Sequence, residues 1–332
     1  MGISYREAGV DIQAGEEAVR QIKSLVKTTF TADVLTDLGS FGGCFQFNKS
    51  RYRQPVLVSS TDGVGTKLLI ARQSQRYDTI GQCLVNHCVN DILTTGARPL
   101  FFLDYIGVGR LRPDRIREII SGLTVACREN GCALIGGEMA EMPGIYQSDD
   151  FDLAGTIVGV VEKNRMLFNR VTAGDRLIGL TSTGLHTNGY SLARRVLLNR
   201  FEMDTTIPEL GETLAETLLK VHRSYLPVIR PFINSLKLHA ISHITGGGIE
   251  GNTRRVLTPG LRLQIDWDAW EWPPIFQLIQ RAGEIATEEM RRVFNLGIGM
   301  ILVVAPEAVR RFTRQLMLAG ECPVILGEVV TE

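Results

Sequence analysis

The sequence predicts an α/β protein with two domains. Helical and strand-like apolar patterns alternate along its 332 residues, and glycine-rich turns follow predicted strands in both halves. A chain of this length is longer than a domain with a single hydrophobic core usually is. Its 44% hydrophobic and 22% charged content is typical of a globular protein. We place the domain boundary between Phe168 and Asn169, which gives an N-terminal domain of residues 1–168 and a C-terminal domain of residues 169–332.

The predicted elements of the N-terminal domain begin with a helix. Val19, Ile22 and Val26 recur at helical spacing, so residues 15–27 are expected to form a helix with one buried face. The apolar run 55–59 predicts a buried strand that leads directly into the motif TDGVGTK. Helices are expected at 81–95 and 112–130, and strands at 100–106, 151–161 and 132–135, the last ending at Gly136-Gly137.

The C-terminal domain is expected to start a second series of strands and helices. Apolar runs predict strands at 175–180, 239–244 and 295–305. Helices are expected at 190–199, after the glycines at 246–248, and at 307–319.

The charge balance and the cysteines narrow the possible functions. Lys plus Arg and Asp plus Glu both number 36, so the chain has no broad basic field for nucleic acid. Residues 1–30 have no apolar run typical of a secretory signal, and the stretch 298–305 is far shorter than the ~20 residues of a membrane span. The six cysteines lack CxxC spacing and are interpreted as reduced thiols. We therefore expect a cytoplasmic protein without nucleic-acid or membrane partners.

The strongest candidate site directly follows the strand at 55–59. Glycines let backbone N–H groups approach phosphate oxygens, Lys67 supplies a positive charge, and Asp62 suits a magnesium ion. The motif is not a Walker A loop, because G-x-x-x-x-G-K-[ST] is absent, and the alternative interpretation is a common tight turn. The predicted ligands of a nucleotide and its metal here are Thr61, Asp62, Gly63, Gly65, Thr66 and Lys67.

Two further acids are candidates for the same metal. Asp91 lies beside the apolar face of the helix at 81–95, and Glu138 follows Gly136-Gly137 at a predicted strand end. Three carboxylates suit Mg²⁺, which keeps waters and takes few protein ligands. The alternative is a set of unrelated surface acids. We predict that Asp62, Asp91 and Glu138 bind the metal together, with Gly136 and Gly137 contacting the nucleotide.

The C-terminal half twice repeats the order of strand, glycine-rich turn and helix. The segments STGLHTNG (182–189) and HITGGG (243–248) combine hydroxyls, amides and glycines at helix starts, where anions bind readily. Simple capping of the first helix by Thr187 or Asn188 is the alternative. His186 and His243 are candidates for proton transfer. The predicted substrate-binding residues are Thr183, Gly184, His186, Asn188, Thr245, Gly246 and Gly247.

Eight segments, spread in order over nearly the whole chain, resemble the phosphoribosylformylglycinamidine cyclo-ligase (AIR synthetase) family. Its superfamily includes formylglycinamidine ribonucleotide synthetase, selenophosphate synthetase and thiamine-monophosphate kinase. The segments are SYREAGVDIQAG, STDGVGTK, CVND, PLFFLDY, GGEMAEMPG, GLHTNGYSL, HITGGG and FNLGIGM.

The resemblance implies a homodimer in which N-terminal strands of two chains join in a β-barrel, with ATP sites near the subunit interface. It also implies that ATP phosphorylates the formyl oxygen of formylglycinamidine ribonucleotide. The ring of 5-aminoimidazole ribonucleotide then closes in purine biosynthesis, releasing ADP and phosphate. The implied cofactors are ATP and Mg²⁺, with Asp62, Asp91 and Glu138 as metal ligands. Our candidate catalytic residues for this reaction are Lys67, His186 and His243.

Some residues depart from the family pattern. Cys83 and His87 stand where Asp and Met are usual. They share a helix face with Asp91, but ligands on consecutive turns diverge too far for a compact zinc site, so His87 is interpreted as a structural histidine. Cys44 follows two glycines, as a reactive cysteine does in selenophosphate synthetase, which leaves that enzyme as an alternative. A catalytically silent ATP-binding subunit is the other.

Overall fold

The computed structural model describes residues 3–332, which form two compact units. Unit 1 contains the residues up to Ile92 together with Arg98–Val160, and unit 2 contains Leu93–Ala97 and Val161–Glu332. The chain thus passes into unit 2 at Val161, whereas the sequence placed the domain boundary between Phe168 and Asn169. Within residues 3–332, no helix has the length and apolarity to span a membrane.

Unit 1 is built on a four-stranded sheet with the strand order β1-β4-β2-β3. β2 and β3 run parallel and are connected through helix α4, whereas β2 and β4 are antiparallel. β1 and β3 are therefore the two edge strands. The elements are α1 (Ile12–Lys27), η1 (Lys49–Arg51), β1 (Pro55–Gly63), α2 (Lys67–Ser74), α3 (Asp78–Leu93), β2 (Arg98–Val108), α4 (Pro113–Asn130), β3 (Ala133–Glu141) and β4 (Phe151–Glu162).

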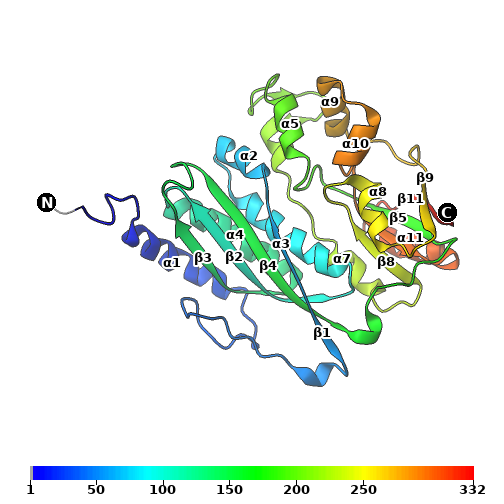
Figure 1. Ribbon diagram of the computed structural model, residues 1–332, viewed down its shortest axis with the longest axis horizontal. Helices are drawn as coiled ribbons and strands as arrows, with labels where there is room; N and C mark the ends of the chain where they lie inside the picture. Colours follow the sequence, from blue (N-terminus) through cyan, green and yellow to red (C-terminus); the bar gives the residue numbers. More distant parts are fainter. Residues whose placement is uncertain (1–2) are drawn as a thin grey trace. The chain divides into compact units, whose positions relative to one another are not determined.

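Helices cover one face of this sheet. α3 and α4 lie side by side behind the strands in Figure 1, and they touch at Gly81, where an added Cβ would lie 2.2 Å from the Ile119 carbonyl oxygen. α3 reaches the sheet where Leu84 and Phe102 pack on Gly155. Successive side chains of a strand point to opposite faces of the sheet. Along the middle strands β2 and β4, the side chains on the face away from these helices are only half buried. This face carries Phe101, Leu103, Tyr105, Ala154, Thr156 and Val158.

Unit 2 contains a five-stranded sheet with the order β8-β10-β5-β11-β9 and a small separate pair, β6-β7. β10 pairs antiparallel with both β5 and β8, so these two strands run parallel to each other. The strands are β5 (Arg176–Thr181), β6 (Thr206–Ile207), β7 (Glu212–Thr213), β8 (Leu238–His243), β9 (Leu261–Ile265), β10 (Ile298–Val304) and β11 (Val324–Thr331).

The core of unit 2 contains fully buried aliphatic residues of β5, β10 and β11, among them Leu177, Ile301 and Leu326. The helices of this unit are labelled in Figure 1, except for α6. They are α5 (Tyr190–Leu197), α6 (Leu214–Leu219), α7 (Leu226–Ile229), α8 (Gly248–Thr253), α9 (Pro274–Gly283), α10 (Thr287–Val293) and α11 (Val309–Leu318), with the short turns η2 (Lys163–Arg165), η3 (Arg230–Phe232), η4 (Arg254–Val256) and η5 (Pro306–Ala308).

The main predicted helices and strands are present, but two predicted strands differ from the structure. The strand expected to be buried at 55–59 is β1, which has no buried residue and continues through Asp62 to Gly63, because it is an edge strand. β3 continues through Gly136 and Gly137 to Glu141 instead of ending at the two glycines. The reason is a close approach across the sheet, because a Cβ on Gly137 would lie 2.4 Å from the Asp104 carboxyl oxygen on β2. Glycine here admits a neighbouring side chain and does not form a turn.

Candidate functional site

In unit 1 a carboxylate and a histidine meet beneath the end of β1. Asp62 Oδ2 lies 2.8 Å from His87 Nε2, and Asp62 Oδ1 accepts a hydrogen bond of 2.7 Å from the Gly63 amide. Burial raises the pKa of Asp62, but the hydrogen bonds and charge supplied by His87 and Gly63 outweigh it, so the pKa lies below its usual value. Asp62 is therefore ionised at neutral pH and can act as a ligand.

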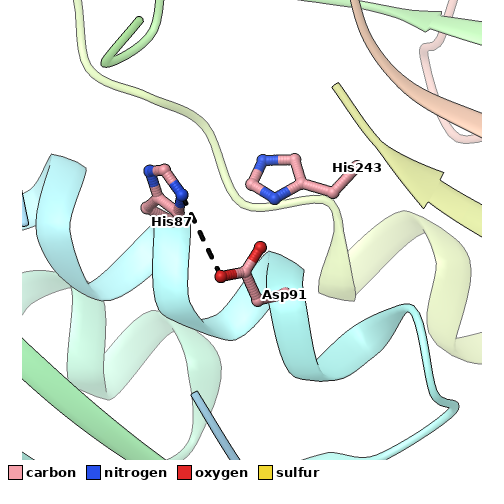
Figure 2. Close-up of side chains that lie close together, drawn as sticks. All are labelled: His87, Asp91 and His243. Atoms are coloured by element: carbon pink, nitrogen blue, oxygen red, sulfur yellow. Dashed lines mark ion pairs between the residues drawn. The ribbon is translucent and has the colours of Figure 1, made fainter. Parts of the chain in front are cut away.

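Asp91 lies one helical turn beyond His87 on α3, as Figure 2 shows. Its Oδ2 is 4.0 Å from His87 Nε2 and accepts a hydrogen bond of 2.9 Å from the Ser60 hydroxyl on β1. The predicted pairing of Asp62 with Asp91 thus has a structural basis, since both acids lie around the same imidazole. The histidine interpreted as structural is the residue that connects them.

Lys67 has a different environment from the one expected. It begins α2, is fully buried, and donates a hydrogen bond of 3.2 Å from Nζ to the Cys83 sulfur on α3. Cys83 is therefore occupied by this lysine, which removes it from any zinc set with His87. The side-chain nitrogen of Lys67 is thus buried at the N-terminal end of α2.

The remaining residues of TDGVGTK divide between the two faces of the sheet. Thr61 points to the half-open face, where its hydroxyl lies 2.8 Å from that of Thr156, because side chains alternate along a strand. Asp62 consequently faces α3. Gly65 has a φ of +68° and, with Thr66, forms an exposed turn before α2. The turn is closed by the Leu68 and Leu69 amides, which donate to the carbonyl groups of Gly65 and Thr66 at 3.1 and 3.2 Å.

Glu138 does not join Asp62 and Asp91 within one chain. It lies in β3, at the opposite edge of the sheet from β1, and two strands separate these edges. Neighbouring strands are ~4.8 Å apart, so the edges are separated by about 14 Å. The prediction assumed that the strand ends at Gly136-Gly137 and that Glu138 lies in the turn after it. In the structure β3 continues to Glu141, so Glu138 is part of the edge strand.

Glu138, Gly136 and Gly137 instead line a cavity of about 290 Å³ between α1, α4 and β3. Asp104 on β2 also lines it and was missed by the sequence reasoning, although it lies within the segment PLFFLDY. Burial raises the pKa of Asp104 to about 7. Its carboxyl group can therefore both donate and accept hydrogen bonds near neutral pH. The only sequence signal was an acid in an otherwise apolar strand.

The two predicted turns of unit 2 do come together. β5 and β8 are parallel, so the turn after Thr181 and the turn after His243 both lie at the C-terminal ends of these two strands. A Cβ on Gly246 would lie 3.3 Å from Asn188 Oδ1, which places the turns in contact. The two turns are therefore neighbours. Of the residues predicted to bind substrate, Thr183, Gly246 and Gly247 are exposed, whereas Gly184 and His186 are buried.

The turn after β5 is held in an unusual conformation. His186 has a φ of +62°, and its Nε2 accepts a hydrogen bond of 3.2 Å from the Thr183 amide. Asn295 donates a hydrogen bond of 2.9 Å to the Gly184 carbonyl and so fixes the middle of the turn. A left-handed non-glycine residue at such a turn is typical of functional sites.

The turn after β8 is held by one buried amide. Asn252 on α8 donates to the carbonyl groups of Thr245, Gly246 and Gly248 at 3.2, 3.2 and 2.8 Å. These three hydrogen bonds from Asn252 hold the backbone of the segment 245–248 in one conformation. His222, which precedes α7 in a stretch without regular structure, also reaches this site, and no sequence motif marked it.

These features define a class of protein. Each unit combines a β-sheet with helices and with glycine-containing turns next to its strands, and unit 1 adds a pair of carboxylates suited to a divalent cation. The chain belongs to the AIR synthase related protein family: the model of the N-terminal domain matches residues 50–161 and that of the C-terminal domain matches residues 172–332.

The chain is similar to curated proteins over almost its full length. It is 50% identical over 330 residues to a phosphoribosylformylglycinamidine cyclo-ligase from Desulfitobacterium hafniense, covering 99% of this chain and 97% of that protein. It is 46% identical over 329 residues to the enzyme of that name from Trichlorobacter lovleyi, covering 98% and 94%.

Solved structures share the fold at low sequence identity. Thiamine-monophosphate kinase from Stenotrophomonas maltophilia has a TM-score of 0.71 at 17% identity, covering 94% of each chain. HypE from E. coli has a TM-score of 0.66 at 15% identity, covering 94% of this chain and 91% of that one. These two likenesses concern the fold alone.

Proposed function

We propose that this protein is a phosphoribosylformylglycinamidine cyclo-ligase. The observation that carries the proposal is 50% identity over 99% of the chain to an enzyme of that name. It would use ATP to close the ring of formylglycinamidine ribonucleotide, forming 5-aminoimidazole ribonucleotide, ADP and phosphate in the cytoplasm. Two related structures support a nucleotide ligand, since one is HypE in complex with ATP and another is a thiamine monophosphate kinase complexed with AMPPCP.

The donor set of unit 1 fits Mg²⁺. Asp62 and Asp91 offer carboxylate oxygens, and Asp62 is held ionised by its neighbours. When bound, the ion neutralises charge on the ATP phosphates. The exposed turn at Gly65-Thr66 contributes backbone amides, and Lys67 contributes a fixed positive charge from below. Together these groups favour transfer of the γ-phosphoryl group to the formyl oxygen.

The turns of unit 2 are proposed to hold the ribonucleotide. The exposed backbone at Gly246-Gly247 offers donors to its phosphate, and Asn188 lies where the two turns meet. Thr183 and Gly184 are proposed to shape this site, since the Thr183 amide already donates to His186. His186 and His243 are proposed to contact the reacting amidine and formyl groups as the ring closes. Most of the catalytic effect then comes from orientation and charge neutralisation.

A homodimer is proposed as the working form. The sheet of unit 1 has two edge strands, and its half-buried face carries Phe101, Leu103 and Tyr105, which a second copy would cover. A second copy would also explain the separation of the acids. Glu138 from one chain could complete the carboxylate pair of the other, because the two lie on opposite edges of the same sheet.

The selenophosphate synthetase alternative depends on Cys44. Its thiol is exposed, while its backbone amide and carbonyl form hydrogen bonds with Thr36 and Leu35. Cys44→Ser keeps these backbone contacts, so a cyclo-ligase should retain its turnover within ~2-fold. An enzyme that needs the thiol as a nucleophile would lose its activity.

The direct test supplies the purified protein with formylglycinamidine ribonucleotide and Mg-ATP. Aminoimidazole ribonucleotide and ADP should appear in equal amounts, and omitting the ribonucleotide should suppress ADP formation. Tight ATP binding without either product would favour the silent subunit instead.

A further inference from the structure

Three buried histidines lie together in unit 2. The rings of His186 and His222 stack with their centroids 4.0 Å apart and an interplanar angle of 17°, and the His222 and His243 centroids are 5.1 Å apart. Their exposed fractions are 1%, 0% and 6% in chain order. His222 thus lies between the two histidines that the sequence marked as candidates for proton transfer.

His222 has a defined contact at each ring nitrogen. Its Nδ1 lies 3.2 Å from Thr187 Oγ1, and its Nε2 lies 3.1 Å from His243 Nε2. Two imidazole nitrogens form a hydrogen bond only when one carries a proton and the other offers its lone pair. The position of the proton on His243 is therefore coupled to that on His222.

The contacts of Thr187 are compatible with one direction of the hydrogen bonds from Thr187 through His222 to His243. The Asn188 side-chain nitrogen, which can only donate, lies 3.5 Å from Thr187 Oγ1. Both contacts are satisfied when Thr187 Oγ1 accepts from Asn188 and the Thr187 hydroxyl donates to His222 Nδ1. The neutral His222 ring then carries its proton on Nε2 and donates it to His243 Nε2. In this arrangement, His243 holds its own proton on Nδ1.

We propose that His222 is a positioning residue that fixes the ring orientation and the tautomer of His243. His243 would then meet the substrate as an N–H donor from Nδ1 and not as a base. This role rests on the proposed function, in which oxygen atoms of the transferred phosphoryl group and of the formyl group gain negative charge. A hydrogen bond to the far nitrogen of a histidine commonly sets its tautomer in this way.

The tautomer can be read in the intact protein without turnover. Histidine labelled with ¹⁵N shows protonated and unprotonated ring nitrogens at well separated shifts, and the chain has 5 histidines to assign. We expect His243 to be protonated on Nδ1 and His222 on Nε2. A wild-type spectrum with the His243 proton on Nε2 would overturn the proposal.

Two variants separate positioning from packing. In His222→Gln the side-chain amide falls near the position of Nε2 and can still donate to His243, whereas in His222→Asn it falls near Nδ1 and cannot. We expect His222→Gln to keep the His243 shifts and a kcat within ~3-fold of wild type. His222→Asn should change those shifts and lower kcat by ~10-fold or more, with KM for ATP within ~2-fold.

Unchanged His243 shifts in folded His222→Asn would contradict the positioning role. If that variant does not fold, the wild-type spectrum alone decides. Failure of the wild-type enzyme to form aminoimidazole ribonucleotide is a separate result, because it would refute the proposed function while leaving the tautomer measurable.

Discussion

His87 Nε2 lies 2.8 Å from Asp62 Oδ2 and 4.0 Å from Asp91 Oδ2, so one buried imidazole on α3 connects acids from a strand and a helix. Its effect on Asp62 is electrostatic as well as geometric, since it helps to keep the pKa of that carboxyl below its usual value. A ligand that is already ionised and oriented loses little entropy when a cation binds.

Asp62→Asn should abolish most activity without unfolding the protein. The amide keeps the shape but loses the charge that holds the cation, so kcat should fall by ~10²-fold or more, and Mn²⁺ binding followed by electron paramagnetic resonance should weaken ~10-fold or more. The matched control is Glu118→Gln, which neutralises an exposed acid on α4. Near-normal turnover in Asp62→Asn would contradict the metal role.

Mixed dimers should reveal whether Glu138 acts across the subunit interface. Asp62→Asn and Glu138→Gln chains are each expected to be inactive as homodimers. If each site takes Asp62 from one chain and Glu138 from the other, the heterodimer contains one intact site and should show roughly half the wild-type turnover. The measurement is kcat of heterodimers purified through two different affinity tags.

The control for this experiment pairs Asp62→Asn with Asp91→Asn. Both residues belong to the same chain's site, so their heterodimer has no intact site and should stay inactive. An equally inactive Asp62→Asn and Glu138→Gln heterodimer would show that Glu138 serves its own chain.

Asp104→Asn should change how stability depends on pH. An unfolded Asp has a pKa of ~3.9, whereas burial raises the folded pKa of Asp104 to about 7. Between these values the folded state retains a proton that the unfolded state has released, so the wild-type free energy of unfolding falls as pH rises toward 7 and then levels off. The free energy of unfolding of the variant does not fall in this way, because Asn does not titrate. Above pH 7 it should exceed the wild-type value by up to ~4 kcal/mol more than it does at low pH.

Urea unfolding of both proteins at pH 5 and pH 8 tests this expectation. The difference in free energy of unfolding between variant and wild type should grow from pH 5 to pH 8, because other titrating groups cancel in the comparison. A difference that is the same at both pH values would place Asp104 in water and not in a buried cavity.

Two glycines of α8 should respond in opposite ways to alanine. Gly248 has a φ of +68°, and a Cβ there would lie 1.9 Å from the Arg291 carbonyl oxygen, whereas a Cβ on Gly251 meets nothing within 4 Å. Gly248→Ala should therefore destabilise the protein by ~2 kcal/mol or more, and Gly251→Ala should stabilise it by up to ~1 kcal/mol. Thermal unfolding of the pair measures both effects, and equal midpoints would contradict the close approach at Gly248.

The sequence was informative where the pattern was local. The apolar spacing of Val19, Ile22 and Val26 predicted α1, and the apolar run 55–59 predicted the start of β1, although Asp62 lies within this strand and not after it. It failed at β3, because the glycines that looked like a turn admit the Asp104 side chain from the neighbouring strand. His222 could not be found either, since it lies in an irregular segment and its partners come from other parts of the chain.

By itself the sequence determined the family, the alternation of helices and strands, and the two glycine-rich turns of unit 2, because these depend on residues close together in the chain. Only the tertiary structure decided that Asp62 and Asp91 share His87, that Glu138 lies at the far edge of the sheet, and that three histidines meet. The physical reason is strand order: hydrogen-bonded pairing between distant segments sets which side chains become neighbours, and no local periodicity encodes it.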